Sequence, residues 1–138
     1  MNRLSYLAST FLLISLHCTA ASAADIDPAL VGQWTGTRDA EGPCQPLSWN
    51  VSFDAAGQFK IAFYQDPEKT QFIQSESGTW TAKEGNWVMH TAGVDKPDVY
   101  TYRLLDADTL EVVNTQASPA SDCQSDYRFV ERRVKTDR

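Results

Sequence analysis

The chain has 138 residues, of which 18 are acidic and 12 are Lys or Arg, so its formal net charge is −6. An acidic protein repels phosphate backbones, which need clustered Lys and Arg, so nucleic acid is excluded as an expected partner. The length is enough for one hydrophobic core but too short for two ordinary domains. The hydrophobic fraction of 42% is typical of a globular protein.

The first twenty-three residues have the pattern of a cleaved signal peptide. Arg3 gives a positive start, residues 4–16 are largely apolar, and Ala21-Ser22-Ala23 has the small-residue pattern of a cleavage site. The apolar run is too short to cross a bilayer, and no other stretch is long enough, so no membrane span is expected. We therefore predict a signal peptide over residues 1–23 and a single periplasmic or secreted domain over residues 24–138.

Cleavage of the signal peptide would change the number of cysteines available for a disulfide. Cys18 would leave with the leader, so the exported domain keeps only Cys44 and Cys123. Thiols pair in an oxidising compartment, and the two remaining cysteines are therefore expected to form one disulfide.

Apolar residues recur with period two rather than 3.6 along almost the whole domain, which is the pattern of half-buried strands. Residues 47–53 show it most clearly, because the odd-numbered side chains there are apolar and the even-numbered ones polar. Turn residues at 54–57 lead into a second alternating run, so these two strands are expected to form a hairpin with odd-numbered side chains inward. In chain order, the predicted strands are 32–38, 47–54, 59–64, 70–82, 87–92, 98–105, 109–115 and 125–133.

Eight consecutive strands joined by short connections, with no helical pattern of useful length, predict an all-β fold, either an eight-stranded antiparallel up-and-down barrel or a sandwich. We favour the barrel, because closure removes both sheet edges. The cysteines agree with it: Cys44 follows the first predicted strand and Cys123 precedes the last, and those two loops emerge at the same end of such a barrel, beside the closing seam.

The two ends of the domain resemble a known family. Gly32-Gln33-Trp34 opens the first predicted strand, and Phe129-Val130-Glu131-Arg132-Arg133 ends the last. This combination resembles the calycin group, in particular small bacterial lipocalin-like domains. The resemblance implies that an arginine near the end of the last strand packs across the Trp34 ring and seals the closed end. Arg132 and Arg133 are both candidates, and we favour Arg133 because it shares parity with Phe129.

Catalytic chemistry has little support. His90 is the only histidine after cleavage, and no nucleophile motif, phosphate-binding glycine loop or Cys-x-x-Cys pair accompanies it. Asp106 and Asp108 are interpreted as turn residues rather than calcium ligands. We therefore expect a non-enzymatic protein with no metal and no cofactor.

The aromatic residues are the remaining candidates for a functional site. If odd-numbered side chains of the second and third strands point inward, they line the barrel together with tyrosines of the sixth strand. A barrel of this size either packs its interior solid or holds one small ligand, and the sequence leaves both open. The candidate ligand-binding residues are Trp49, Phe53, Phe59, Phe63, Tyr100 and Tyr102.

Two functions follow from these observations. The first is an exported lipocalin-like protein, expected to be a monomer, that binds a small hydrophobic or amphipathic molecule in the barrel. The second is a protein-binding module of the cell envelope, such as an inhibitor of a secreted hydrolase. It would act through the loop 116–124, which the predicted disulfide would hold beside Cys44.

Overall fold

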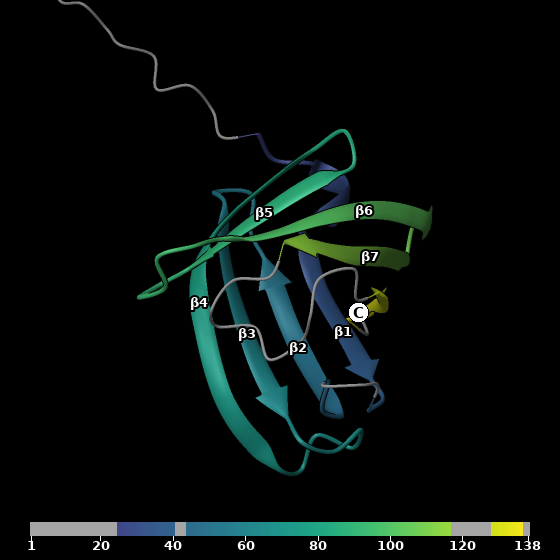
Figure 1. Cartoon of the computed structure of the whole chain (residues 1–138). Helices are drawn as coiled ribbons and strands as arrows, with labels where there is room; N and C mark the ends of the chain where they lie inside the picture. The colour runs from purple at the N-terminus through teal and green to yellow at the C-terminus, as the bar shows by residue number, and fades with distance from the viewer. Residues whose placement is uncertain (1–24, 41–43, 117–127, 137–138) are drawn as a thin grey trace, which may run out of the picture.

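The computed structural model describes residues 25–40, 44–116 and 128–136. It is a closed barrel of eight antiparallel strands in which each strand pairs with the next along the chain and the last pairs with the first (Figure 1). This confirms the predicted all-β, up-and-down topology. The strands are β1 (Gly32–Arg38), β2 (Leu47–Phe53), β3 (Gln58–Tyr64), β4 (Phe72–Lys83), β5 (Asn86–Thr91), β6 (Asp98–Asp106), β7 (Thr109–Gln116) and β8 (Arg128–Arg133).

The register of β2 and β3 confirms that their odd-numbered side chains share the inner face. Trp49 lies opposite Phe63, and Phe53 lies opposite Phe59. Successive strand residues point to opposite faces, so a register that pairs odd with odd places the whole apolar set on one side. Trp49, Phe53 and Phe59 are accordingly buried, at 4%, 3% and 2% exposure.

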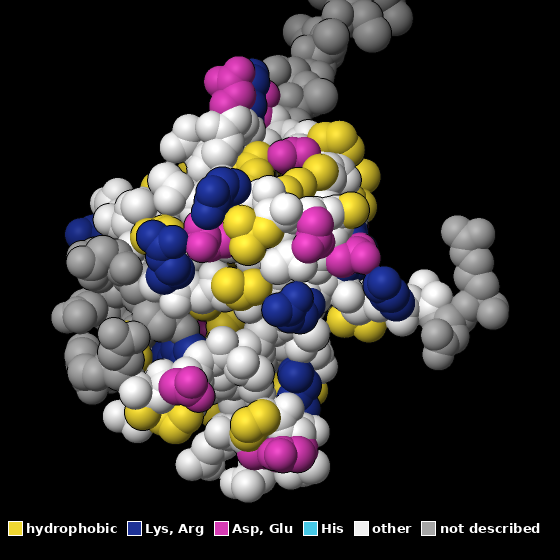
Figure 2. Space-filling model, turned by 90° about the vertical axis from the view of Figure 1, so that its right-hand side faces the viewer, with side chains coloured by type: hydrophobic (Ala, Val, Ile, Leu, Met, Phe, Trp, Pro, Cys, Tyr) yellow, Lys and Arg dark blue, Asp and Glu magenta, His cyan; other side chains and the backbone are white. Residues whose placement is uncertain are grey.

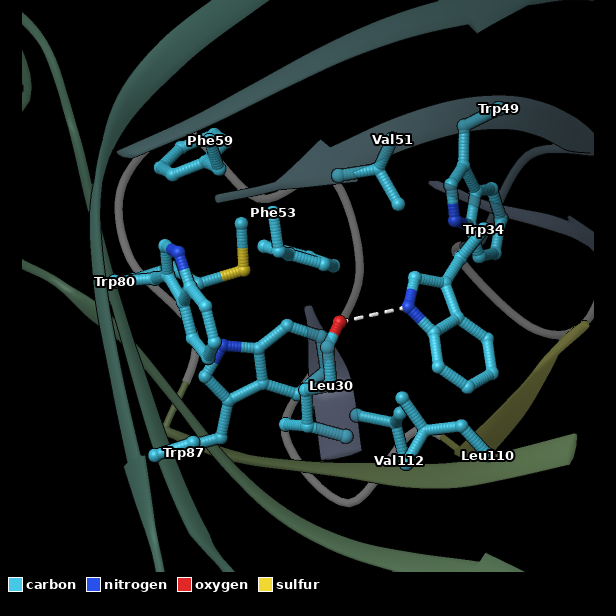
Figure 3. Packing of buried hydrophobic residues seen from close by; sticks show 12 residues of the cluster. Leu30, Trp34, Trp49, Val51, Phe53, Phe59, Trp80, Trp87, Leu110 and Val112 are labelled. Atoms are coloured by element: carbon cyan, nitrogen blue, oxygen red, sulfur yellow. Dashed lines mark hydrogen bonds between the residues drawn. The ribbon is translucent and has the colours of Figure 1, made fainter. Parts of the chain in front are cut away.

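One end of the barrel is filled by side chains. A single 3-10 turn, η1 (Pro28–Leu30), precedes β1 and buries Leu30 completely. The Trp34 Nε1–H donates to the Leu30 carbonyl at 2.8 Å, as Figure 3 shows. Leu110 and Val112 from β7 lie beside this pair and are also fully buried. Through this close packing, η1 and the side chains around it fill and close this end of the barrel, and we call them the plug.

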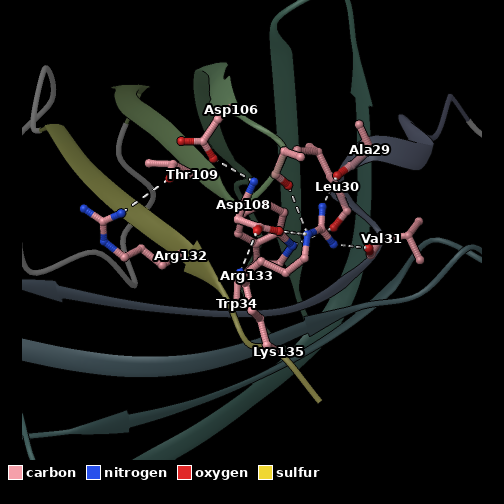
Figure 4. Close-up of polar contacts among 11 residues, drawn as sticks. Ala29, Leu30, Val31, Trp34, Asp106, Asp108, Thr109, Arg132, Arg133 and Lys135 are labelled. Carbon is pink, nitrogen blue, oxygen red and sulfur yellow. Dashed lines mark hydrogen bonds and ion pairs between the residues drawn. The ribbon is translucent and has the colours of Figure 1, made fainter. Parts of the chain in front are cut away.

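Arg133 lies across this plug. Its guanidinium carbon is 4.2 Å from the centroid of the Trp34 ring. The same group donates to three carbonyl oxygens, those of Ala29 at 2.6 Å, Val31 at 2.8 Å and Ala107 at 3.1 Å (Figure 4). The structure thus brings Trp34 and Arg133 together in a cation–π stack and ties η1 to the end of β8.

The structure shows why the first residue of the Gly-x-Trp pattern, Gly32, is a glycine. Its φ of +135° is a conformation that side-chain-bearing residues rarely adopt, and a Cβ there would lie 2.7 Å from Arg133 Nη1. Asp108 Oδ1 lies 3.5 Å from Nε of the same guanidinium. Glycine therefore provides the space that the arginine occupies.

Several sequence expectations fall outside the described residues. The predicted signal peptide lies entirely there, as do Cys123 and residues 117–124 of the predicted presentation loop. Cys44 is described, just before β2, and is 3% exposed. The disulfide between Cys44 and Cys123 stays a prediction.

The outer surface carries charges of both signs. On the face drawn in Figure 2, basic and acidic side chains are interspersed among small hydrophobic groups. Within residues 25–40, 44–116 and 128–136, no helix has the length and apolar character needed to cross a membrane.

Candidate functional site

The half of the barrel away from η1 contains a cavity of about 500 Å³ that opens to solvent at a rim. This volume lies within the range of about 300–1,000 Å³ found for small-molecule sites. The rim comes from the connection between β1 and β2 and from the β3–β4 hairpin. It is formed by Arg38, Gln45, Pro46, Gln65, Ile73 and Gln74.

A continuous series of aromatic ring contacts forms much of the wall. The Trp49 and Phe129 rings meet edge to face at 5.1 Å between centroids, and Phe129 is 6.1 Å from Tyr100. Tyr100 is in turn 5.5 Å from Trp87, which meets Phe53 at 5.0 Å. All five residues line the cavity. These rings pack against one another, and the surface of the wall is mainly apolar.

Five of the six candidate ligand-binding residues line the cavity, as a set: Trp49, Phe53, Phe59, Phe63 and Tyr100. Tyr102 is not among the lining residues. Its hydroxyl donates to Asp27 Oδ2 at 2.7 Å, close to η1. Burial, together with this hydrogen bond, raises the pKa of Tyr102 to about 12. Tyr102 thus fastens the segment before η1 to β6.

Glu131 is a cavity residue that the sequence analysis did not single out. It lies on β8, lines the cavity and is only 3% exposed. Oε1 accepts a hydrogen bond from Trp49 Nε1 at 2.7 Å, while Oε2 is buried with no hydrogen-bond partner among the described residues. Burial disfavours the charged form and raises the pKa of Glu131 to about 7, although the Trp49 hydrogen bond acts in the opposite direction.

The pairing of β1 with both of its neighbours explains how Trp49 reaches Glu131. Gly36 on β1 lies opposite Trp49 on β2 and also opposite Glu131 on β8. A Cβ on Gly36 would overlap the Trp49 indole ring. The missing side chain therefore lets the indole lie across β1 and donate to the carboxylate on the far side.

Alternation along β8 carried a signal for Glu131. The residue shares parity with Phe129 and Arg133, which the sequence analysis placed on one face of the strand. Extending that face to the residue between them would have placed a carboxylate inside the barrel. A buried carboxyl group is uncommon enough to be a candidate functional residue.

The other ionisable groups near the cavity are mostly acidic. Glu76 on β4 lines it, and burial raises the pKa of this carboxyl group. Burial also raises the pKa of Tyr100, with smaller contributions from the charges of Asp98, Glu131 and Glu76. Arg38 is the one basic residue of the lining in the described part of the chain, and its Nε donates to the Gln45 carbonyl at the rim.

Trp87 contributes the second buried polar atom for which the described residues offer no partner. The residue is 1% exposed and lines the cavity, and its Nε1–H donates to no group in the described segments. Leaving a buried donor or acceptor without a partner costs about 1–3 kcal/mol. Trp87 Nε1 and Glu131 Oε2 are therefore two buried polar atoms, on residues that line the cavity, whose hydrogen bonding the described segments leave unsatisfied.

The arrangement offers few groups for metal binding or nucleophilic catalysis. His90 is exposed on β5, and the described segments contain no cluster of three His, Cys, Asp or Glu side chains able to hold a metal ion. Asp106 Oδ1 accepts a hydrogen bond from the Asp108 backbone N–H at 2.8 Å, which is the ordinary chemistry of a turn. The cavity can enclose an apolar molecule and make a small number of directed polar contacts.

Comparison of the chain with protein-family models, with curated proteins and with solved structures gives no significant match. The eight-stranded antiparallel barrel is compatible with a lipocalin-like fold.

Proposed function

We propose that this chain is a lipocalin-like member of the calycin group that binds a small amphipathic molecule inside the barrel. The observation that carries this proposal is the cavity of about 500 Å³, walled largely by aromatic rings and lined by a buried glutamate, Glu131. A barrel that served only as a structural core would gain stability by filling this volume.

The division of the barrel into a solid half and a hollow half supports the same conclusion. Leu30, Trp34 and Arg133 close one end, so the cavity walls are held by a rigid base. Apolar burial would provide most of the affinity, since wall residues such as Phe53 and Phe59 are already ordered. The few polar groups would orient the ligand.

A titration with the neutral apolar dye Nile red tests the proposal. The purified protein is expected to enhance the dye's fluorescence with saturation at one site. Phe63→Ala, which removes part of the wall, should weaken binding severalfold. The matched control Phe72→Ala removes a 60% exposed ring that is not part of the lining and should bind as the unaltered protein does.

A cavity-filling variant sharpens the test. Ile61 lines the cavity opposite Val51, and Ile61→Trp would occupy part of the volume that the dye needs. Nile red binding should be lost while the barrel remains folded by far-UV circular dichroism. Equal binding by Ile61→Trp, Phe63→Ala and the unaltered protein would place the dye on the surface and refute a ligand site in the barrel.

A further inference from the structure

The buried carboxylate sets a condition on the ligand's chemistry. Glu131 lines the cavity, and its Oε2 is buried with no hydrogen-bond partner in the described part of the chain. Oε1 already accepts from Trp49 Nε1 and holds the group in one orientation. Because Glu131 lines the cavity, a ligand that places a positive charge or a hydrogen-bond donor beside it can compensate this carboxylate. An apolar ligand would leave it uncompensated.

Further charges around the cavity favour a positively charged donor over a neutral one. Glu76 lines the same cavity, and the charge of Asp98 acts on both Glu76 and Tyr100. Arg38, the opposing basic residue of the lining, lies at the rim with its guanidinium directed to the Gln45 carbonyl. Electrostatic interactions are stronger in an enclosed, weakly polar space than in water, so the excess of carboxylates attracts a cation and repels an anion.

The aromatic wall is suited to the same charge. Trp49, Phe129 and Tyr100 form consecutive ring contacts, and Trp49 directs its N–H edge to Glu131, so this group of rings lies next to the carboxylate. The faces of such rings carry negative electrostatic potential and attract ammonium groups. Phe53, Phe59 and Met89 make the rest of the wall apolar.

We infer that the cavity takes an organic cation, an amine with an apolar body whose ammonium group pairs with the Glu131 carboxylate and lies against the aromatic wall. This inference rests on the proposed function and names the ligand class of that same site.

Competition between three matched amphiphiles tests the inference. Dodecylamine, dodecanol and dodecanoic acid have the same alkyl chain and differ in the charge of the head group, which is positive, neutral and negative, respectively, near neutral pH. Each is used below its micelle concentration to displace Nile red from the full domain. A charge-assisted hydrogen bond should make dodecylammonium bind about 10- to 100-fold more tightly than dodecanol. Dodecanoate should bind most weakly.

Two carboxamide variants separate the role of Glu131 from a general effect of charge. Glu131→Gln should weaken the binding of dodecylammonium far more than that of dodecanol, and so remove the preference between them. Glu111→Gln, on the neighbouring strand β7, removes a carboxylate that pairs with Arg103 and Arg128, and should keep the full preference.

The outcomes distinguish the two proposals. If Nile red binds but dodecylammonium has no advantage over dodecanol, or keeps its advantage in Glu131→Gln, the inference of a cationic ligand is wrong and the barrel remains a ligand site. Tighter binding of dodecanoate would likewise overturn it and indicate an anionic ligand. If neither Nile red nor any of the three amphiphiles binds, the proposed function itself fails, and the inference fails with it.

Discussion

Replacing Glu131 by glutamine should stabilise the ligand-free protein, and increasingly so as the pH rises. The folded-state pKa of Glu131 is raised from 4.5 to about 7 because the carboxyl group is fully buried. A raised carboxyl pKa means that the folded state holds this proton more tightly than the unfolded state does. Stability associated with this group is therefore retained below about pH 4.5 and lost as the pH rises towards 7 and above.

The size of the effect follows from the shift. One pKa unit corresponds to about 1.4 kcal/mol, so ionising Glu131 inside the folded protein costs about 3 kcal/mol. Glutamine keeps an oxygen acceptor for the Trp49 Nε1–H and carries no charge. Glu131→Gln is therefore expected to be more stable than the unaltered protein by about 1 kcal/mol near pH 5 and by about 3 kcal/mol near pH 8.

Urea unfolding followed by tryptophan fluorescence measures this difference, with both proteins examined at several pH values. Glu111→Gln is the matched control. The hydrogen bond and charge of Arg103, with those of Arg128, lower the pKa of Glu111, so replacing Glu111 should cost stability without a growing difference over the same range. A free-energy difference between Glu131→Gln and the unaltered protein that stays constant from pH 5 to pH 8 would refute a buried, titrating Glu131.

Three further predictions follow from the same contacts. Arg133→Met removes the donors to the Ala29, Val31 and Ala107 carbonyls, and should lower the free energy of unfolding by about 2–4 kcal/mol, whereas Lys135→Met, a neighbouring exposed change, should have little effect. An unchanged urea midpoint in Arg133→Met would contradict the closed-end account. Gly36→Ala should displace the Trp49 indole from Glu131 and lower the free energy of unfolding by about 1–3 kcal/mol. Thr37→Ala, at the exposed neighbouring position, should change that free energy little. Equal stability of the two variants would show that the indole does not need this space. The ratio of the affinity for dodecylammonium to that for dodecanol should decrease from pH 8 to pH 5, because protonation of Glu131 removes the charge that the ammonium pairs with. An affinity ratio independent of pH would contradict that pairing.

Alternation of apolar residues was sufficient to predict the strands and the inner face of β2 and β3. The period of two fixes which face a side chain takes, and Trp49, Phe53, Phe59 and Phe63 all follow it. The same rule does not give the depth of a residue along the barrel. Tyr100 and Tyr102 share a face, yet Tyr100 lines the cavity and Tyr102 bonds to Asp27 near η1.

Glu131 shows where sequence reasoning failed. In β8 the parity of Phe129 and Arg133 pointed to the inner face, but a glutamate between them is normally interpreted as a solvent-exposed residue. The structure inverts this, with Val130 36% exposed and Glu131 buried. The reason is a contact across three strands, in which Gly36 makes room for the Trp49 indole to reach β8.

The sequence pattern also could not predict whether the barrel contains a cavity. Whether the inner side chains meet at the barrel axis depends on their summed volume and on where η1 enters, not on their periodicity. Leu30 and Trp34 fill only the closed end, and the remaining rings line the wall without closing the space between them.

The four tryptophans provide the most direct test of the central claim that a cationic amphiphile binds within the barrel. Trp49 and Trp87 line the cavity, whereas Trp34 and Trp80 donate their indole N–H groups to the carbonyls of Leu30 and Asp54 at the closed end. Titration with dodecylamine, followed by NMR of the indole N–H resonances, should shift those of Trp49 and Trp87 strongly and leave those of Trp34 and Trp80 nearly unchanged. Shifts of equal size at all four, or no shift at Trp49, would contradict a ligand held between the aromatic wall and Glu131.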